Sequence, residues 1–336
     1  MWQKIRAMLK KNRFILTFVR LMKNAGESCP LVYHCRDYTQ NDFVRTLAKI
    51  LVTPYCALKW FIVRERPGRE GLAFVLIAKN EATYIKEWLD FHIKQGVTKF
   101  IIYDNESTDN FREVLSPYID AGIVIYDVIK GKRRQRDAYN MALNTYRDKF
   151  KYMGFIDADE FVFVRNNTYG GGGTNSILTF MDDFMAAHPN AGGLGINWLI
   201  FGSSHHEKKP EGGVLENFTM CAEKDSFWQN RFIKAIIDPA RVLVQFVHSP
   251  TCRKGYYYLD ENGEIIKLIS GTLSEQVHFD KIRINHYFCK SLEEYIAIKQ
   301  ARGDVFFGRS LKNTTLDFFY DCDRNDIIDT EILSRR

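Results

Sequence analysis

Between residues 72 and 164 the chain alternates short apolar runs with segments of helical periodicity, and this alternation restricts the folds open to it. The apolar runs cover residues 72–78, 99–103, 123–128 and 152–156. The segments between them carry apolar residues three or four positions apart, which is typical of helices packed on a sheet. Strands that alternate with helices in this way form a parallel sheet with helices on both faces. The sequence therefore predicts the α/β class.

Each predicted strand ends in polar residues. These clusters are residues 79–81, 104–109, 130–136 and 157–160. The carboxyl ends of parallel strands meet at one edge of a sheet, and ligands of open α/β sheets bind there. We therefore expect the four clusters to converge on one site.

The last of these clusters contains Asp157 and Asp159, separated only by Ala158. Two carboxylates so close together repel each other unless a cation neutralises them, and oxygen ligands suit Mg²⁺ or Mn²⁺. The alternative is a strand followed by an ordinary acidic turn, because an Asp-x-Asp pair is common by chance.

Composition and net charge limit the kinds of ligand and the cellular compartment that suit this chain. The 336 residues are 46% hydrophobic and 26% charged, which is typical of a globular protein. The net charge of +6 suits anionic ligands or an anionic membrane surface and does not require nucleic acid. The seven cysteines are widely spaced without a Cys-x-x-Cys pair, so we expect reduced thiols and a cytoplasmic protein.

Residues 1–23 mix apolar side chains with seven Lys and Arg residues. They contain no apolar run long enough to span a bilayer and no secretory signal pattern. A basic amphipathic helix here would lie on an anionic membrane, giving a peripheral protein on the inner face of the cytoplasmic membrane. The alternative is an ordinary surface helix that packs on the domain.

Four ordered motifs resemble glycosyltransferases of the GT-A fold, specifically family 92 (related to family 2) and its bacterial relatives. The motifs are LIAKNEATYIKEWLDFHIKQGVTKFIIYDNESTD, FIDADEFV, NWLIFGSSHH and INHYFCKSLEEYIAIKQARG, and they fall between residues 70 and 305. The resemblance implies a metal-dependent enzyme that moves a hexose from a UDP-sugar, with galactose or glucose favoured, to a glycan or lipid-linked lipopolysaccharide-type acceptor with inversion. Together with the sequence pattern it predicts three parts, which are a helical leader at 1–70 that could associate with a membrane, the GT-A domain at 71–290 and a helical extension at 291–336.

The resemblance assigns roles on the donor side. Asp104 would hydrogen-bond the uracil or ribose, and residues Lys79, Asn80 and Glu81 would line the nucleotide pocket. Asp157 and Asp159 would hold the Mn²⁺ or Mg²⁺ ion, with His286 completing the metal shell, unless His286 is a buried residue of an aromatic cluster. Arg134, with Arg136, would contact the diphosphate, unless both belong to a solvated helix start.

On the acceptor side we expect Trp198 to stack on a sugar ring, with His205 and His206 beside it. The catalytic base would be Glu216, with Glu211 and Glu160 as competitors. The alternative is that Trp198 is a core residue and Glu216 a surface ion-pair partner. The chain departs from the family pattern at His205, where glycine is expected, and at Asn217, where arginine is expected, so the acceptor is uncertain.

Two other functions compete with transfer of a sugar. A nucleotidyltransferase also uses carboxylates at strand ends, but it carries a Gly-rich basic signature after the first strand, and residues 76–81 have none. An inactive relative that serves as a binding scaffold is disfavoured by the intact Asp104, Asp157 and Asp159.

Overall fold

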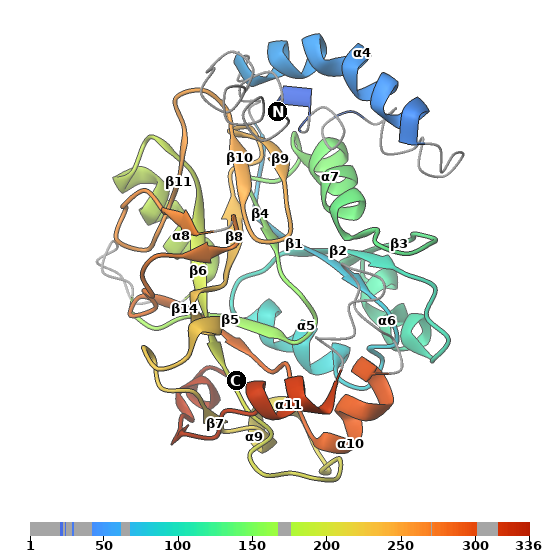
Figure 1. Ribbon diagram of the computed structural model, residues 1–336, viewed down its shortest axis with the longest axis vertical. Helices are drawn as coiled ribbons and strands as arrows, with labels where there is room; N and C mark the ends of the chain where they lie inside the picture. The colour runs from blue at the N-terminus through green and yellow to red at the C-terminus, as the bar shows by residue number, and fades with distance from the viewer. Residues whose placement is uncertain are drawn as a thin grey trace, which may run out of the picture.

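The computed structural model describes residues 21–22, 24, 29, 42–61, 68–166, 176–269, 271–300 and 315–336. Its centre is a nine-stranded mixed sheet in the order β3-β2-β1-β4-β8-β6-β14-β5, with β11 beside β6. Helices flank this sheet (Figure 1). The predicted α/β class is therefore confirmed, whereas the predicted membrane segment at 1–23 falls almost wholly outside the described residues.

The four predicted strands form the parallel half of the sheet. They are β1 (Leu72–Ala78), β2 (Lys99–Asp104), β3 (Val124–Val128) and β4 (Tyr152–Phe155). β1 lies between β2 and β4, and β3 lies outside β2, all in parallel. This pairing brings the carboxyl ends of all four strands to one edge, as the alternating sequence pattern requires.

The other half of the sheet is mixed. β8 (Ile233–Ile237) runs antiparallel to β4 and to β6 (Ala191–Ile200). β14 (Ile282–His286) pairs in parallel with β6 and antiparallel with β5 (Glu160–Val164), while β11 (Tyr257–Leu259) pairs in parallel with β6. β4 is thus the strand at which the parallel half ends.

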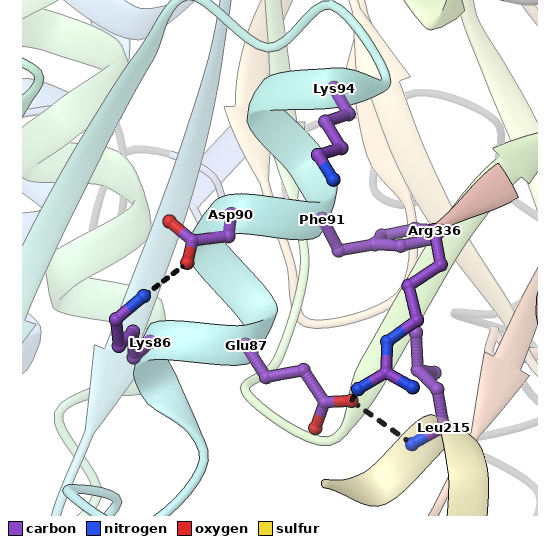
Figure 2. A pocket seen from close by; sticks show the side chains of 7 residues that line it. All are labelled: Lys86, Glu87, Asp90, Phe91, Lys94, Leu215 and Arg336. Carbon is purple, nitrogen blue, oxygen red and sulfur yellow. Dashed lines mark hydrogen bonds and ion pairs between the residues drawn. The ribbon is translucent and has the colours of Figure 1, made fainter.

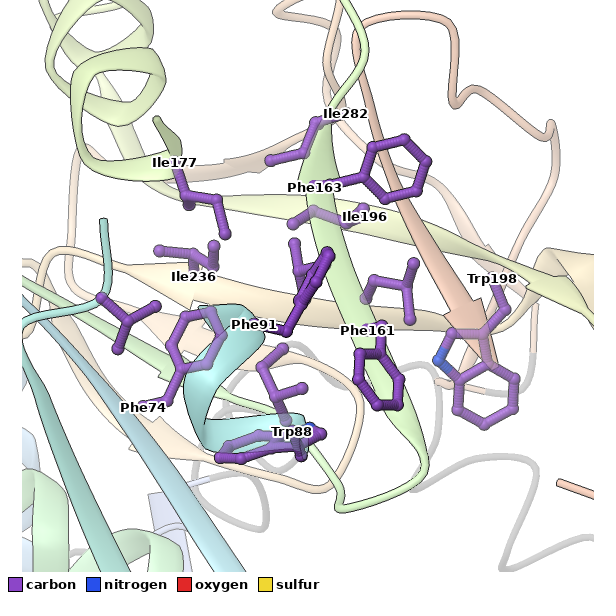
Figure 3. Packing of buried hydrophobic residues seen from close by; sticks show 14 of the residues in the cluster. Phe74, Trp88, Phe91, Phe161, Phe163, Ile177, Ile196, Trp198, Ile236 and Ile282 are labelled. Atoms are coloured by element: carbon purple, nitrogen blue, oxygen red, sulfur yellow. The ribbon is translucent and has the colours of Figure 1, made fainter. Parts of the chain in front are cut away.

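Both faces of the sheet are buried, which explains why the strands read as continuous apolar runs. The helices α5 (Ile85–Lys94), α6 (Phe111–Asp120) and α8 (Ile177–Ala187) contribute to the larger core on one face. α7 (Gln135–Tyr146) contributes to the smaller core on the other face. Phe74 of β1 and Trp88 of α5 lie in the larger core, as Figure 3 shows.

α4 (Asp42–Phe61) lies at the opposite end of the molecule from α10 (Leu292–Glu294) and α11 (Leu316–Cys322) (Figure 1). It packs through Cys56 on Leu243 and Val244 of β9 (Val242–Gln245), which pairs with β10 (Pro250–Cys252). Over the part of the chain that the structure describes, none of the helices is both long enough and apolar enough to span a membrane.

The C-terminal residues return to the domain. They form α10 (Leu292–Glu294), the π-helical turn η2 (Tyr295–Gln300), α11 (Leu316–Cys322), β15 (Ile327–Ile328) and the 3₁₀ turn η4 (Glu331–Arg335). β15 pairs with β7 (Met220–Cys221). The remaining short elements are α9 (Val214–Asn217), η1 (Trp228–Arg231), β12 (Leu268–Ile269) and β13 (Leu273–Ser274).

Candidate functional site

Asp157 and Asp159 lie in the turn between β4 and β5, at the carboxyl edge of the parallel half of the sheet. The turn is closed by two hydrogen bonds, from Glu160 N to Asp157 O at 3.1 Å and from Asp157 N to Glu160 Oε2 at 2.9 Å. Tyr287 N, which follows β14, donates to Asp159 O at 2.8 Å. The two aspartates are therefore fixed between β4, β5 and the end of β14.

Three protein donors hold the carboxylate of Asp157. Lys234 Nζ lies 2.6 Å from Oδ2, while Tyr139 OH and Gln135 Nε2 donate to Oδ1 at 2.9 and 3.0 Å. Burial acts to raise the pKa of Asp157, but the ammonium group of Lys234 outweighs it and the pKa lies below its ordinary value. Asp157 is therefore charged and held in one orientation.

Lys234 is a site residue that the sequence analysis missed. It lies in β8, is fully buried, and also approaches Glu160 Oε1 at 3.5 Å. Burial acts to lower the pKa of Lys234, but Asp157 and Glu160 raise it, so the lysine is a buried cation. The sequence does contain one sign of a buried cation, because Lys234 is the single charged residue inside the apolar run 232–237.

Asp159 faces a different set of cations. Lys299 Nζ of η2 lies 2.5 Å from Oδ2, and His286 Nε2 at the end of β14 lies 3.5 Å from Oδ1. Burial acts against the charged form, but Lys299 and His286 hold the pKa of Asp159 well below its usual range. Asp159 is thus contacted by the predicted His286 and by Lys299, which was not predicted.

Asp159 and His286 fit a shared divalent cation. The His286 ring is buried among the rings of Trp198 and Phe288, as the alternative of an aromatic-cluster residue expects, but its Nε2 is turned toward Asp159 Oδ1. Within the described ranges no three His, Cys, Asp or Glu side chains are grouped to hold a metal alone. Such a two-ligand arrangement suits Mg²⁺-type ions, which complete their shell with water and substrate phosphates. Asp157, with both oxygens bound by protein donors, is better placed to orient the turn.

A second polar cluster surrounds Asp104 at the end of β2. Tyr126 OH donates to Asp104 Oδ2 at 2.6 Å and Ser107 N donates to Oδ1 at 2.8 Å. Burial and the bond to Asp104 raise the pKa of Tyr126 to about 12, so the phenol stays a donor. Asn80, in the left-handed region at φ 57°, accepts from Thr108 N at 2.7 Å. The loops after β1 and β2 therefore form one connected wall.

Lys290 lies between the two clusters. Its Nζ is 3.9 Å from Glu81 Oε2, and its charge contributes to the low pKa of Asp159. Lys290 and Lys299 were not among the predicted site residues, although both lie in the last of the four motifs.

The predicted basic residues of the loop before α7 are partly committed to the protein. Arg134 is buried, with Nε 2.8 Å from Asp137 Oδ2 and Nη1 donating to Lys130 O at 3.3 Å. Arg136 and Lys79 are half-buried. The structure thus holds Arg134 against the first turn of α7, which corrects the picture of a solvated helix start.

Trp198 lies in the core, which corrects the expectation of an open stacking platform. Its side chain is 7% exposed, and its ring lies 4.1 Å from that of His286 and 4.8 Å from that of Phe232. The physical reason is the parallel pairing of β6 with β14, which sets Trp198 beside Ile284, and Figure 3 shows Trp198 among the buried apolar side chains of the larger core. Trp198 therefore backs the His286 ring.

His205 and His206 lie on a loop that the C-terminal residues order. Ser203 N donates to Asp323 Oδ1, and Ser204 N donates to Asn325 Oδ1 at 2.8 Å. His205 is exposed and has a positive φ of 64°, whereas His206 is half-buried with its carbonyl accepting from Leu292 N. The loop is thus fixed on α10 with His205 facing solvent.

Glu216 belongs to a different cluster, so the structure does not place this predicted base beside Asp159. It is exposed in α9, accepts from Gly213 N at 2.9 Å, and pairs with Arg336 Nη1 at 2.9 Å. The Arg336 hydrogen bond lowers the pKa of Glu216, which makes the carboxylate a weaker base. Arg336 also approaches Glu87 in a pocket of about 300 Å³ on the outer side of α5 (Figure 2).

The two competing base candidates differ in their surroundings. Glu160 is fully buried, and burial raises its pKa well above the ordinary value. Glu211 is exposed on the loop before α9.

Comparison with known proteins gives one family. A sequence model described as Glycosyltransferase family 92 matches residues 75–287. A glycosyltransferase family 92 protein of Ricinus communis is 25% identical over 202 residues, covering 59% of this chain and 34% of the relative. A galactan beta-1,4-galactosyltransferase of Arabidopsis thaliana is 31% identical over 90 residues, covering 24% of this chain and 17% of the relative. The chain spans about a third of the length of the family 92 relatives of Ricinus and Oryza sativa that it matches.

Similarity to solved structures is weaker. Staphylococcus aureus TarS 1–349 has a TM-score of 0.36 and 14% identity, covering 75% of this chain and 71% of that chain. Glucosyl-3-phosphoglycerate synthase of Mycobacterium tuberculosis, solved with Mn²⁺ and UDP, has a TM-score of 0.24 and 19% identity, covering 39% and 44%.

Proposed function

Because this chain belongs to glycosyltransferase family 92, whose sequence model covers residues 75–287, we propose that it transfers a hexose from a UDP-sugar to a glycan or lipid-linked saccharide acceptor. The observation that carries the proposal is the pair Asp159 and His286, with Oδ1 and Nε2 3.5 Å apart, at the edge of the sheet that also carries the Asp104 cluster. A nucleotide sugar needs a site for its diphosphate next to a site for its nucleoside. The Asp159–His286 pair would provide the first and the Asp104 cluster the second.

Two groups of residues would bind the two parts of the donor, its nucleoside and its diphosphate. Asp104, held by Tyr126 and Ser107, presents a rigid carboxylate to the nucleoside. Lys79, Asn80 and Glu81 form the adjoining wall.

On the diphosphate side, Asp159 and His286 would hold a Mn²⁺ or Mg²⁺ ion. When bound, such an ion neutralises the charge that develops on the leaving UDP. Lys290 and Lys299 add fixed positive charge beside Asp159, and Arg134 lies at the start of α7, where Gln135 contacts Asp157. Preorganised cations of this kind stabilise a leaving group without reorganising during the reaction.

The donor sugar and the stereochemistry are finer points of the proposal. Galactose is favoured over glucose, since one similar protein is named a galactan beta-1,4-galactosyltransferase. Inversion requires a carboxylate beside the acceptor hydroxyl, and Glu216, paired with Arg336, is a poor candidate for it. His205 and His206 remain as acceptor-side residues on the loop fixed by the C-terminal segment. A lipopolysaccharide-type acceptor would place the enzyme at the cytoplasmic face of the membrane, where residues 1–23 would add basic contacts.

The test is a UDP-release assay with a panel of UDP-sugars and saccharide acceptors, with Mn²⁺, with Mg²⁺ or with a chelator. We expect UDP release with one or two UDP-hexoses, stimulated by the metal, and a product of inverted anomeric configuration by NMR. Release of pyrophosphate from a sugar phosphate and UTP would indicate a nucleotidyltransferase. Nucleotide-sugar binding without turnover on any acceptor would indicate a scaffold.

A further inference from the structure

The helix α4 carries two apolar faces, and the fold uses only one of them. Cys56, with the partly buried Val52 and Trp60, packs on Leu243 and Val244 of β9. This contact anchors the helix to the domain and leaves its other side turned outward. A surface helix normally presents polar residues on that outer side.

The outward side of α4 is apolar instead. Leu47, Ile50, Leu51, Tyr55 and Leu58 are 44–71% exposed. Their spacing of three and four residues places them in one stripe along the helix, which we call the α4 stripe. A contiguous exposed apolar surface of this kind marks an interaction site, whereas isolated exposed apolar residues are ordinary.

The distribution of charge identifies the partner. Residues 1–41, which lead into α4, contain eight basic and two acidic residues, a net charge of +6 that equals the net charge of the whole chain. The remaining residues, 42–336, carry 39 basic and 39 acidic residues. The entire positive excess therefore precedes the helix that carries the stripe, and α4 itself adds Arg45, Lys49 and Lys59 against Asp42.

We propose that the α4 stripe is a docking surface for an anionic lipid membrane, with the helix lying in the plane of the headgroups. An apolar stripe inserts into the boundary between headgroups and acyl chains, and neighbouring basic residues bind the anionic headgroups. A second copy of this chain would fit less well, because both copies would carry the same positive excess and like charges repel.

Docking through α4 has a geometric consequence. α4 lies at the opposite end of the molecule from α10, on which the loop at 202–213 is fixed (Figure 1). A bilayer against α4 therefore leaves that loop on the aqueous side. Such a placement of the loop suits a lipid-linked acceptor whose reacting sugar lies away from the membrane surface. This consequence rests on the proposed function, whereas the docking surface itself does not.

The test compares the full chain with Leu47→Gln/Leu51→Gln in sedimentation with vesicles of phosphatidylethanolamine and phosphatidylglycerol. Ile328→Gln on β15 is the matched control, because Ile328 is 72% exposed and Leu51 is 71% exposed. We expect the double variant to lose at least about tenfold in vesicle partitioning, since two apolar side chains no longer insert. The control should bind as the unmodified chain does. Tyr55→Gln/Leu58→Gln, at the other end of the stripe, provides a second pair if the first variant melts early.

Three results would overturn the proposal. The first is that the full chain does not bind vesicles, and the second is that both stripe variants bind vesicles as strongly as the unmodified chain does. The third is that the unmodified chain is a dimer in solution and the stripe substitutions convert it to a monomer. UDP release measured without vesicles should be the same for all variants. If neither the unmodified chain nor any variant releases UDP, that result counts against the proposed transferase activity. The vesicle-binding result would still test the docking surface independently.

Discussion

Lys234 provides the sharpest test of how the acidic turn is held. Its ammonium group is fully buried, 2.6 Å from Asp157 Oδ2 and 3.5 Å from Glu160 Oε1. At an effective dielectric constant of about 20, two unit charges 2.6 Å apart attract each other by about 6 kcal/mol. Much of that attraction offsets the cost of burying the two charges, so the net value of the pair is far smaller than its Coulomb energy.

Replacing Lys234 by methionine keeps the buried hydrocarbon stem and removes the charge. Asp157 then keeps only the hydrogen bonds from Tyr139 and Gln135, and Glu160 loses its nearest cation. We expect Lys234→Met to lower the free energy of unfolding by about 2–3 kcal/mol, less than the usual cost of breaking a fully buried pair, because the Asp157 side chain is 30% exposed.

Lys151→Met is the matched control. Lys151 Nζ also lies 2.6 Å from an aspartate oxygen, that of Asp182, but both side chains are nearly half exposed. We expect this variant to lose at most about 1 kcal/mol, because solvent screens an exposed pair.

The measurement is urea unfolding followed by circular dichroism, on Lys234→Met, Lys151→Met, Asp157→Asn and the double variant Lys234→Met/Asp157→Asn. The double variant should be more stable than the sum of its single variants predicts, because the removed partners no longer leave each other unpaired. If Lys234→Met costs no more than Lys151→Met, or if the two effects add, the buried cation does not hold the turn.

Three further outcomes are expected. Asp159→Ala should abolish metal-stimulated UDP release and lower the melting temperature by a few degrees at most, because Lys299 loses its carboxylate partner while the Asp157–Lys234 pair stays intact; normal turnover would refute the assignment of Asp159. Glu216→Gln should leave kcat within about twofold of the unmodified chain, because this exposed carboxylate pairs with Arg336; a fall of about 10²-fold would restore it as the base. Burial holds the pKa of His92 and of His248 at about 3, below the ordinary value, so only the unfolded chain takes up these protons as the pH falls below about 6.5. The unfolding free energy should therefore drop by about 2 kcal/mol per histidine between about pH 7 and pH 5, and a flat urea-midpoint profile would contradict this.

The parts of the fold that local pattern controls could be predicted from the sequence. The run 72–78 and the helix after it follow from periodicity, and Gly96, at φ 90°, ends that helix as its flexibility allows. The position of Asp157 and Asp159 after the fourth strand also follows from the local pattern. These features depend on neighbours within a few residues.

The predictions that proved wrong concern residues whose surroundings are formed by distant parts of the chain. Asp157 is held by Lys234, 77 residues later in the chain. Trp198 is buried because β6 pairs with β14, and Glu216 is paired by Arg336, 120 residues away. A single sequence carries no signal for such pairings, so Trp198 and Glu216 were given roles that their surroundings do not support.

The dependence of the loop at 202–213 on the C-terminal residues also sets an order of events during synthesis. Ser203 is bound by Asp323, which follows it by 120 residues. Ribosomes add about 5–20 residues per second, so this loop leaves the ribosome roughly 6–24 s before the residue that orders it. During that interval the nascent chain can pair its parallel strands, but the loop at 202–213 becomes ordered only after residue 323 has been synthesised.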